Sequence, residues 1–389
     1  MDTQFIVKAF LIVAFFMPLK VWSQTDSVTV GGRLKNATAE RIKSISIQVI
    51  LEDGKSKYYG SPLLSDSFAI RIPSQTNVTE AMIRVIPEDH NKVVMYRPLS
   101  LFVQQDDIFV DGDGYQLQSA HVSGGIDNAL YNVLRQQTAP YTKEVQKAYD
   151  LLYSKDIILD KQAKDSIMLR IKAWSLEERN LQKVFISNHP TSYASLSLLS
   201  RMKNAYSSDD FKLAFEGLGD KYKDTRVAAD LRAFILKNSV TTKGTMAKIF
   251  DRTTVKGVPF KLDELKGRVV LLDFWGSWCG PCRASMPHLI ELYERYKQQG
   301  FEIVGIAQER GKTLADSKNS WVKAIDELGI HWVQVLNNEG KEHFDIVKEY
   351  AVGSFPTQIL LDQEGKILIR LTSSAADDIA VALKKIYGF

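Results

Sequence analysis

The chain has 389 residues, of which 45% are hydrophobic and 25% are charged, as in soluble globular proteins. Its length predicts two or three domains. The net charge is +4 and no basic block occurs, which argues against nucleic-acid binding. The two cysteines, Cys279 and Cys282, are too close together to link distant parts of a fold, so they predict redox chemistry or metal binding. The six histidines lack the spacing of a zinc site, and we expect no metal and no cofactor.

The N-terminal segment, residues 1–23, predicts a secretory signal peptide. Lys8 precedes the apolar run Ala9–Leu19, and Ser23 offers a small residue for cleavage. The alternatives are an uncleaved membrane anchor and a buried helix, although a bilayer span needs about 20 apolar residues and this run is shorter. We therefore expect export to the periplasm or cell envelope, an oxidising compartment.

Residues 26–125 predict a small all-β domain that resembles a sandwich. Short apolar runs recur at regular spacing, separated by clusters of Gly, Pro, Asn and Asp. The runs are Ile45–Val49, Phe68–Ile72, Ala81–Ile86 and Ser100–Val110.

Residues 126–240 predict a helical region, because apolar residues recur at steps of three and four. Asn188–Thr191 interrupts this pattern, and Ser208 is a candidate N-cap for a later helix. The aromatic residues Trp174, Phe185 and Tyr193 have helical spacing, which favours a packed core over a cofactor site.

Residues 244–389 predict an α/β domain, because apolar strands alternate with helical patterns. Val269–Trp275 is nearly continuous in apolar residues, as in strands that are buried on both faces. Other expected strands are Phe301–Ala307, His331–Leu336, Thr357–Asp362 and Ile367–Leu371, and the expected helices are Pro287–Gln298, Ser320–Leu328 and His343–Tyr350.

The two cysteines follow a buried strand and open a helix in the sequence Cys279-Gly280-Pro281-Cys282. The free N–H groups and the dipole at a helix N-terminus favour a thiolate, so we expect a lowered pKa for Cys279 and assign it as the nucleophile. Cys282, one turn later, can then close on Cys279 to complete thiol–disulfide exchange.

These residues resemble the thioredoxin superfamily, and the resemblance covers about Gly244–Phe389. Asp273-Phe274-Trp275 precedes the cysteines as in thioredoxin, Pro287 matches the proline that kinks the family's helix, and Phe355-Pro356-Thr357 looks like its cis-proline loop. The additional strand and helix before Pro356 resemble the TlpA/ResA branch of exported proteins. The first half is similar to the N-terminal extension, often called DUF4369, of TlpA-like proteins from Bacteroidetes, an extension with no well-established activity to carry over to this chain.

The resemblance implies a redox-active disulfide between Cys279 and Cys282, with Asp273 as a buried acid that accepts the proton of Cys282. The ResA group often has a Glu where this chain has Ser285. Alternatively, Asp273 ends a strand and has no catalytic role. A substrate-binding role is implied for five residues around the cysteines: Trp278, Gly280, Pro281, Phe355 and Pro356.

The sequence thus predicts an exported thiol–disulfide oxidoreductase that acts on protein thiols and disulfides in the cell envelope. The Gly-Pro dipeptide is that of thioredoxin and favours a reductant, which implies a membrane electron donor and a role similar to cytochrome c maturation. The alternatives are a disulfide oxidase or isomerase and a redox-sensing binding protein of the envelope. A peroxiredoxin is disfavoured, because the sequence has no Thr-x-x-Cys motif.

Overall fold

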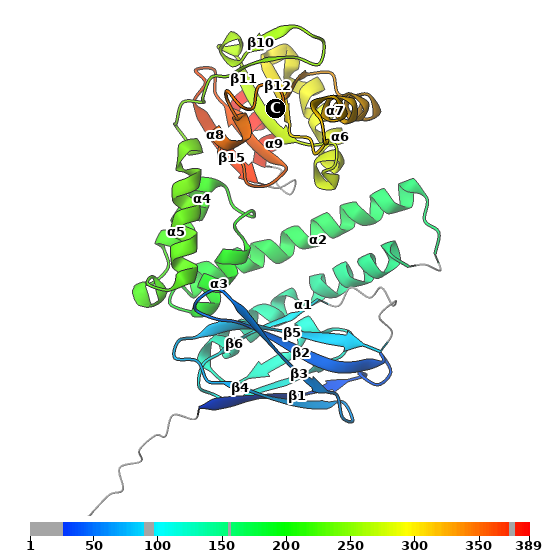
Figure 1. Cartoon of the computed structure of the whole chain (residues 1–389), viewed down its shortest axis with the longest axis vertical. Coiled ribbons are helices and arrows are strands. Elements are labelled where there is room, and N and C mark those ends of the chain that lie inside the picture. The colour runs from blue at the N-terminus through cyan, green and yellow to red at the C-terminus, as the bar shows by residue number, and fades with distance from the viewer. Residues whose placement is uncertain (1–25, 89–96, 155–156, 373–377) are drawn as a thin grey trace, which may run out of the picture.

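The computed structural model describes residues 26–88, 97–154, 157–372 and 378–389. Two β-sheets, a group of helices and an α/β domain follow one another along the chain and along the long axis of the molecule (Figure 1). This order confirms the predicted fold class. The predicted signal peptide, residues 1–23, lies outside the described residues. No helix within the described ranges has the length and apolar character that crossing a bilayer requires.

The N-terminal part consists of two four-stranded sheets with strand orders β4-β1-β7-β8 and β3-β2-β5-β6. Alternate residues of the strands are buried, so the two sheets share one apolar core. The predicted run Ser100–Val110 forms two strands instead of one, because the polar residues Gln104–Asp107 separate them. The strands are β1 (Ser27–Lys35), β2 (Ile42–Ile50), β3 (Ser56–Pro62), β4 (Ser67–Pro73), β5 (Thr79–Pro87), β6 (Leu99–Val103), β7 (Ile108–Asp113) and β8 (His121–Ser123).

The helical part comprises α1 (Ile126–Leu152), α2 (Lys161–Asn188), α3 (Tyr193–Arg201), α4 (Ser208–Glu216) and α5 (Arg226–Asn238). Phe185 and Tyr193 are buried in one apolar cluster, and Trp174 is partly buried in another, so these aromatic residues belong to the core. The N-cap of α4 is Ser207 and not Ser208, because Ser207 has the extended backbone and its hydroxyl accepts the N–H of Asp210.

Buried polar side chains of α1 join the helices to the sheets. The side-chain amide of Asn128 pairs with both the N–H and the carbonyl of Phe102, and Asn132 does the same with Val122. On α3, the Ser197 hydroxyl donates to the buried carboxylate of Glu80 at 2.6 Å. The asparagine bonds satisfy backbone groups of the edge strands β6 and β8, and together with the Ser197–Glu80 bond they fix the helices on the sandwich.

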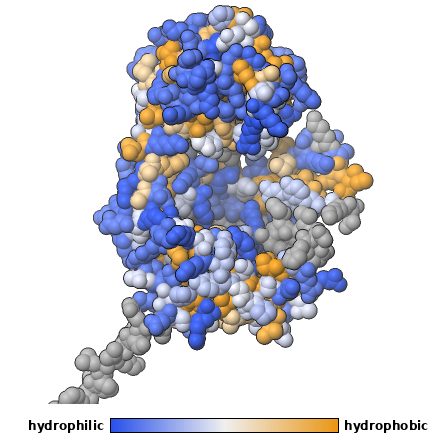
Figure 2. All heavy atoms as spheres, in the orientation of Figure 1, coloured by the Kyte–Doolittle hydropathy of each residue, from blue (hydrophilic) through white to orange (hydrophobic). Residues whose placement is uncertain are grey.

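The free end of the α1–α2 hairpin carries exposed apolar side chains. Ile158 is 99% exposed, and Leu169 and Tyr153 are more than half exposed. Figure 2 shows apolar surface at this end of the molecule. Exposed apolar groups that gather at one place are typical of contact surfaces for other molecules.

The C-terminal domain contains a five-stranded sheet of order β13-β12-β11-β14-β15, in which β11, β12 and β13 are parallel and β14 and β15 are antiparallel. An apolar core covers each face of this sheet. Its strands are β11 (Val269–Trp275), β12 (Phe301–Ala307), β13 (Val333–Leu336), β14 (Thr357–Leu361) and β15 (Ile367–Thr372), and a hairpin of β9 (Asp251–Thr253) and β10 (Pro259–Lys261) precedes them. Its helices are α6 (Gly280–Tyr296), α7 (Leu314–Leu328), α8 (Ile346–Glu349) and α9 (Asp378–Tyr387).

Several of the predicted C-terminal elements have different bounds in the structure. The helix predicted from Pro287 is α6 and begins at Gly280, because Cys279 is its N-cap. Helix α7 begins at Leu314, well before the predicted Ser320, because Thr313 and Asp316 form a reciprocal capping box. The predicted helix His343–Tyr350 is reduced to the single turn of α8, which Asp345 caps. The strand predicted from His331 begins at Val333.

A buried arginine on β15 joins the C-terminal domain to the segment that follows α5. Arg370 is 3% exposed, and its guanidinium donates to the Thr241 hydroxyl at 2.7 Å and to the Tyr350 carbonyl at 2.6 Å. A third bond reaches the carbonyl of Ala351 at 3.2 Å. Desolvation lowers the pKa of Arg370 to about 10, so the side chain remains charged at neutral pH.

Candidate active site

The two cysteines form a disulfide at the N-terminus of α6, directly after the buried strand β11. Cys279 is the N-cap residue, and its sulfur accepts the backbone N–H of Cys282 at 3.2 Å. Free N–H groups and the helix dipole at this position stabilise negative charge, so the reduced form of Cys279 favours the thiolate. Pro281 lies in the first turn, where its missing N–H costs no helical hydrogen bond.

Cys279 is more accessible to solvent than Cys282, as exchange requires of the cysteine that attacks first. Cys279 is 4% exposed, whereas Cys282 is completely buried. Gly280 and Pro281, which connect them, are exposed, and a Cβ added at Gly280 would meet no atom within 4 Å. The pair is therefore accessible from the side of Gly280 and Pro281, and Cys279 is the more exposed of the two cysteines.

Trp278 and Phe355 bring the cysteine loop and the proline loop together. The Phe355–Pro356 peptide bond is cis, and the Phe355 ring meets the Trp278 ring edge to face at a centroid distance of 5.6 Å. The Trp278 indole N–H donates to the Gln308 carbonyl at 2.8 Å, and the guanidinium of Arg310 stacks on its ring. Trp278 is thus held in one orientation beside the disulfide by three contacts. Trp275, in contrast, is fully buried.

Asp273 lies on the face of the sheet that carries the cysteines. Side chains alternate along β11, and its neighbours on that face, Leu271 and Trp275, pack in the same apolar core as Cys279 and Cys282. The carboxyl group is 1% exposed. Burial raises the pKa of Asp273 to about 7, and a hydrogen bond from Gln358 opposes this rise. The carboxyl group can therefore hold or release a proton near neutral pH.

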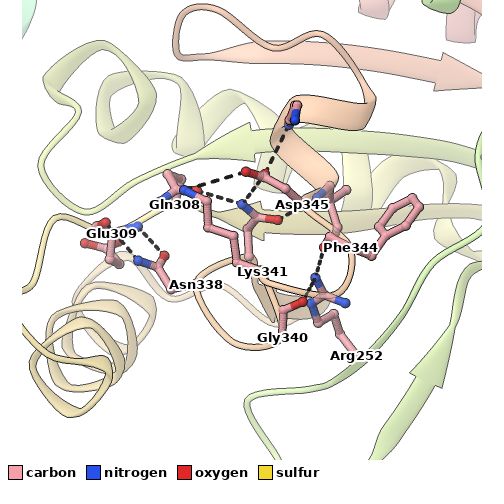
Figure 3. Close-up of polar contacts among 11 residues, drawn as sticks. Arg252, Gln308, Glu309, Asn338, Gly340, Lys341, Phe344 and Asp345 are labelled. Carbon is pink, nitrogen blue, oxygen red and sulfur yellow. Dashed lines mark hydrogen bonds and ion pairs between the residues drawn. The ribbon is translucent and has the colours of Figure 1, made fainter.

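A second buried acid, Glu309, supports the loop before Cys279. It is 4% exposed, and its carboxylate accepts the backbone N–H of Ser277 at 2.7 Å and the Ser277 hydroxyl at 2.6 Å. Its own backbone is paired with the side chain of Asn338 at 2.8 and 3.0 Å. Figure 3 shows how these bonds join the end of β12 to the loop after β13.

The same network continues toward the proline loop. Asn337 donates to the side chains of Gln308 at 2.7 Å and Asp345 at 2.9 Å, and Asp345 caps the short helix α8. The guanidinium of Arg252 donates to the backbone carbonyl of Phe344, just before Asp345. Local sequence patterns do not predict this network, because Arg252, Glu309 and Asn337 belong to separate parts of the chain and only the tertiary fold brings them together.

Replacing Glu309 by leucine is expected to lower the free energy of unfolding by about 2–3 kcal/mol, because the Ser277 N–H and hydroxyl lose a charged acceptor. Chemical denaturation of the oxidised protein measures this change. The matched control is Glu339→Gln, which removes the half-exposed ion pair with Lys318 and should cost less than about 1 kcal/mol. Equal losses in the two variants would show that Glu309 does not support the loop.

Of the predicted substrate-binding residues, Gly280 and Pro281 lie between the two cysteines and Trp278 directly precedes them. Phe355, whose bond to Pro356 is cis, contacts Trp278. Ser285, which stands where the ResA group often has Glu, donates its hydroxyl to the Cys282 carbonyl at 2.8 Å. Within the described residues, no three His, Cys, Asp or Glu side chains form a group that could hold a metal ion.

A cavity of about 580 Å³ lies elsewhere, between the β-sandwich and the helical part. Its lining includes Glu80, Tyr193 and Arg226. None of the residues around the disulfide contributes to it, so this cavity is separate from the disulfide.

Known proteins resemble the C-terminal part of the chain. A family model described as the AhpC/TSA family matches residues 243–370. The thiol-disulfide oxidoreductase ResA of Bacillus thuringiensis is 34% identical over 144 residues, which cover 37% of this chain and 78% of that protein. The chain belongs to the ResA-like thiol–disulfide oxidoreductases.

Two further similarities are to a second ResA protein and to a solved thioredoxin domain. ResA of Geobacillus kaustophilus is 30% identical over 154 residues, or 39% of this chain and 83% of that protein. The thioredoxin domain of a thiol-disulfide oxidoreductase from Bacteroides vulgatus is 32% identical and spans 37% of this chain and 97% of that chain, with a TM-score of 0.33. The ResA relatives confirm the predicted thiol–disulfide oxidoreductase class, and the sheet and helices of the C-terminal domain have the predicted α/β thioredoxin-like architecture.

Proposed function

We propose that the chain is an exported reductant of protein disulfides in the periplasm or cell envelope. The observation that carries this proposal is Cys279 at the N-cap of α6, with the dipeptide Gly280-Pro281 before Cys282. A helix N-terminus favours the attacking thiolate, and Gly-Pro is the dipeptide of thioredoxin, whose potential is about −270 mV. Export is supported by the leader-like segment 1–23 and by the use of both cysteines in one disulfide.

The reaction starts from the reduced dithiol. The Cys279 thiolate attacks one sulfur of a substrate disulfide, and the other substrate sulfur leaves as a thiolate. Cys282 gives its proton to Asp273 and attacks Cys279, so that the Cys279–Cys282 bond forms as the bond between Cys279 and the substrate breaks. The substrate gains two electrons and the enzyme becomes the disulfide. A membrane electron donor must then reduce the enzyme again.

The substrate-binding residues of this proposal are Trp278, Gly280, Pro281, Phe355 and Pro356. Gly280 and Pro281 leave the approach to Cys279 open, and the paired rings of Trp278 and Phe355 border it. An extended substrate segment would lie against the proline loop with its disulfide above Cys279.

We further propose that residues 26–240 form an extension of the DUF4369 type that binds a partner in the envelope. The exposed apolar side chains near the end of the α1–α2 hairpin, among them Ile158 and Leu169, favour this role. In that arrangement the C-terminal domain supplies the chemistry and the preceding part brings the partner close.

The direction of electron flow is tested by the reduction potential of the Cys279–Cys282 pair together with an insulin reduction assay. We expect a potential near −270 mV and rapid precipitation of insulin, as for a thioredoxin-like reductant. A potential above about −150 mV would instead make the protein an oxidase, because strong oxidants such as DsbA lie in that range.

A further inference from the structure

Gln358 on β14 faces Asp273 directly across the antiparallel β11–β14 ladder. It lies two residues after Pro356, and Leu360, on the same face of β14, packs in the core that contains the cysteines. Side chains directly opposite each other in an antiparallel pair are close enough to interact. The register of the sheet thus places an amide group beside the buried acid and next to the proline loop.

The contact between the two side chains is specific to one carboxylate oxygen. The Gln358 amide donates from Nε2 to Oδ1 of Asp273 at 3.2 Å, and Gln358 itself is only 6% exposed. Oδ2 of Asp273 is buried and has no hydrogen-bond partner among the described residues. A buried polar atom without a partner is unfavourable unless it serves a purpose, so this oxygen is the candidate to take up a proton.

We propose that Gln358 is a positioning residue that holds Oδ1 of Asp273 and leaves Oδ2 free to accept the proton of the Cys282 thiol. This inference rests on the proposed function, in which Asp273 is the acceptor. In the step concerned, the proton moves from the Cys282 sulfur to Oδ2, the resulting thiolate attacks Cys279, and the bond between Cys279 and the substrate breaks with the electron pair leaving on the substrate sulfur.

The amide also sets the pH at which the acid can act. A hydrogen bond donated to a carboxylate stabilises its ionised form, and here it works against the desolvation of Asp273. Without the donor, less of the acid is ionised at neutral pH and fewer molecules can accept the proton. The resolution step should therefore move to higher pH, whereas the attack by Cys279 should not change.

The test uses the full chain and the aromatic disulfide 5,5′-dithiobis(2-nitrobenzoate). In the first phase, attack by Cys279 releases one aromatic thiolate. In the second phase, Cys282 resolves the mixed disulfide and releases the other. The variant is Gln358→Met, which keeps the volume and removes the donor. We expect the pH midpoint of the second phase to rise by about one unit and its rate at pH 7 to fall about five-fold. The first phase should retain its wild-type rate.

The matched control is Gln334→Met. Gln334 is a buried glutamine of the same sheet that accepts a hydrogen bond from Trp275 at 3.0 Å, and its removal should leave the midpoint unchanged. A second variant, Gln358→Glu, places another acid beside Asp273. It should raise the pH midpoint of the second phase further than Gln358→Met does, because two neighbouring carboxyl groups resist double ionisation. An unmoved midpoint in both Gln358 variants would overturn the proposal.

A double variant separates this inference from the proposed function. If Gln358 acts through Asp273, adding Gln358→Met to Asp273→Asn changes the second phase no further than Asp273→Asn alone. A further slowing in the double variant would contradict the positioning role while leaving Asp273 as the acceptor. If Asp273→Asn itself leaves the second phase unaltered, the acceptor role fails, and the inference fails with it.

Discussion

Replacing Cys279 by serine is expected to remove all thiol–disulfide exchange by this protein. A hydroxyl group at the helix N-terminus is not ionised at neutral pH and cannot form the mixed disulfide. Insulin reduction and the release of thiolate from an aromatic disulfide should both fall to the uncatalysed rate. Reduced wild-type protein is the matched control for folding, because it also lacks the Cys279–Cys282 bond.

The companion variant Cys282→Ser should behave differently. Cys279 can still attack, but without the buried thiol the mixed disulfide is not resolved and accumulates. Gel electrophoresis without reductant, after expression in the native envelope, should therefore show covalent adducts that identify the substrates. Exchange that persists in Cys279→Ser, or adducts that are equally abundant in the two variants, would refute the assignment of Cys279 as the nucleophile.

The second large effect is expected for Asp273→Asn. An asparagine cannot accept the Cys282 proton, so the resolution step should slow by about a hundred-fold at neutral pH. The attack by Cys279 should keep its rate, which distinguishes a lost proton acceptor from a disturbed site. An unchanged rate and pH profile would remove Asp273 from the mechanism.

The same variant should change how stability depends on pH. Asp273 is protonated in the native state up to about pH 7, whereas the unfolded chain releases this proton near its ordinary pKa of 3.8. Between pH 3.8 and about pH 7 the native state holds one more proton than the unfolded chain. The free energy of unfolding therefore falls as pH rises through this range, by on the order of 4 kcal/mol in total, and does not change further above pH 7. Asp273→Asn removes this slope. Denaturation of both oxidised proteins at pH 4 and pH 8 should show the variant gaining stability relative to wild type at the higher pH.

The sequence was sufficient to predict the cysteine pair and its setting because these features are local. Cys279, Pro281 and Cys282 are neighbours in the chain, and the apolar run before them defines the strand that positions them. The predicted order of all-β, helical and α/β parts also follows from local periodicity. Asp273 was predicted as a buried acid, and the structure places it with 1% exposure on the side of the cysteines.

The partners of these residues depend on register and on loops, which local patterns do not determine. Gln358 meets Asp273 only because β14 pairs antiparallel with β11 in one register, and a shift of one residue would turn it to the opposite face. Glu309 reads as an ordinary charged residue after a strand, yet it is buried and holds Ser277. The helix predicted at 343–350 is shortened to α8 because the side chains of Asn337 and Asp345 accept N–H groups of its first turn and fix its start at Ile346.

Arg370 has a practical consequence for dividing the chain. A fragment that begins at residue 244 keeps every strand of the C-terminal sheet but loses the Thr241 hydroxyl, one of the three acceptors of this buried cation. The two acceptors that remain are the backbone carbonyls of Tyr350 and Ala351, shortly before the proline loop, so the fragment loses one contact of the side chain that holds this part of the chain. A fragment that begins at Ser239 retains the short turn that carries Thr241, and it is the better choice for comparing the isolated redox domain with the whole protein.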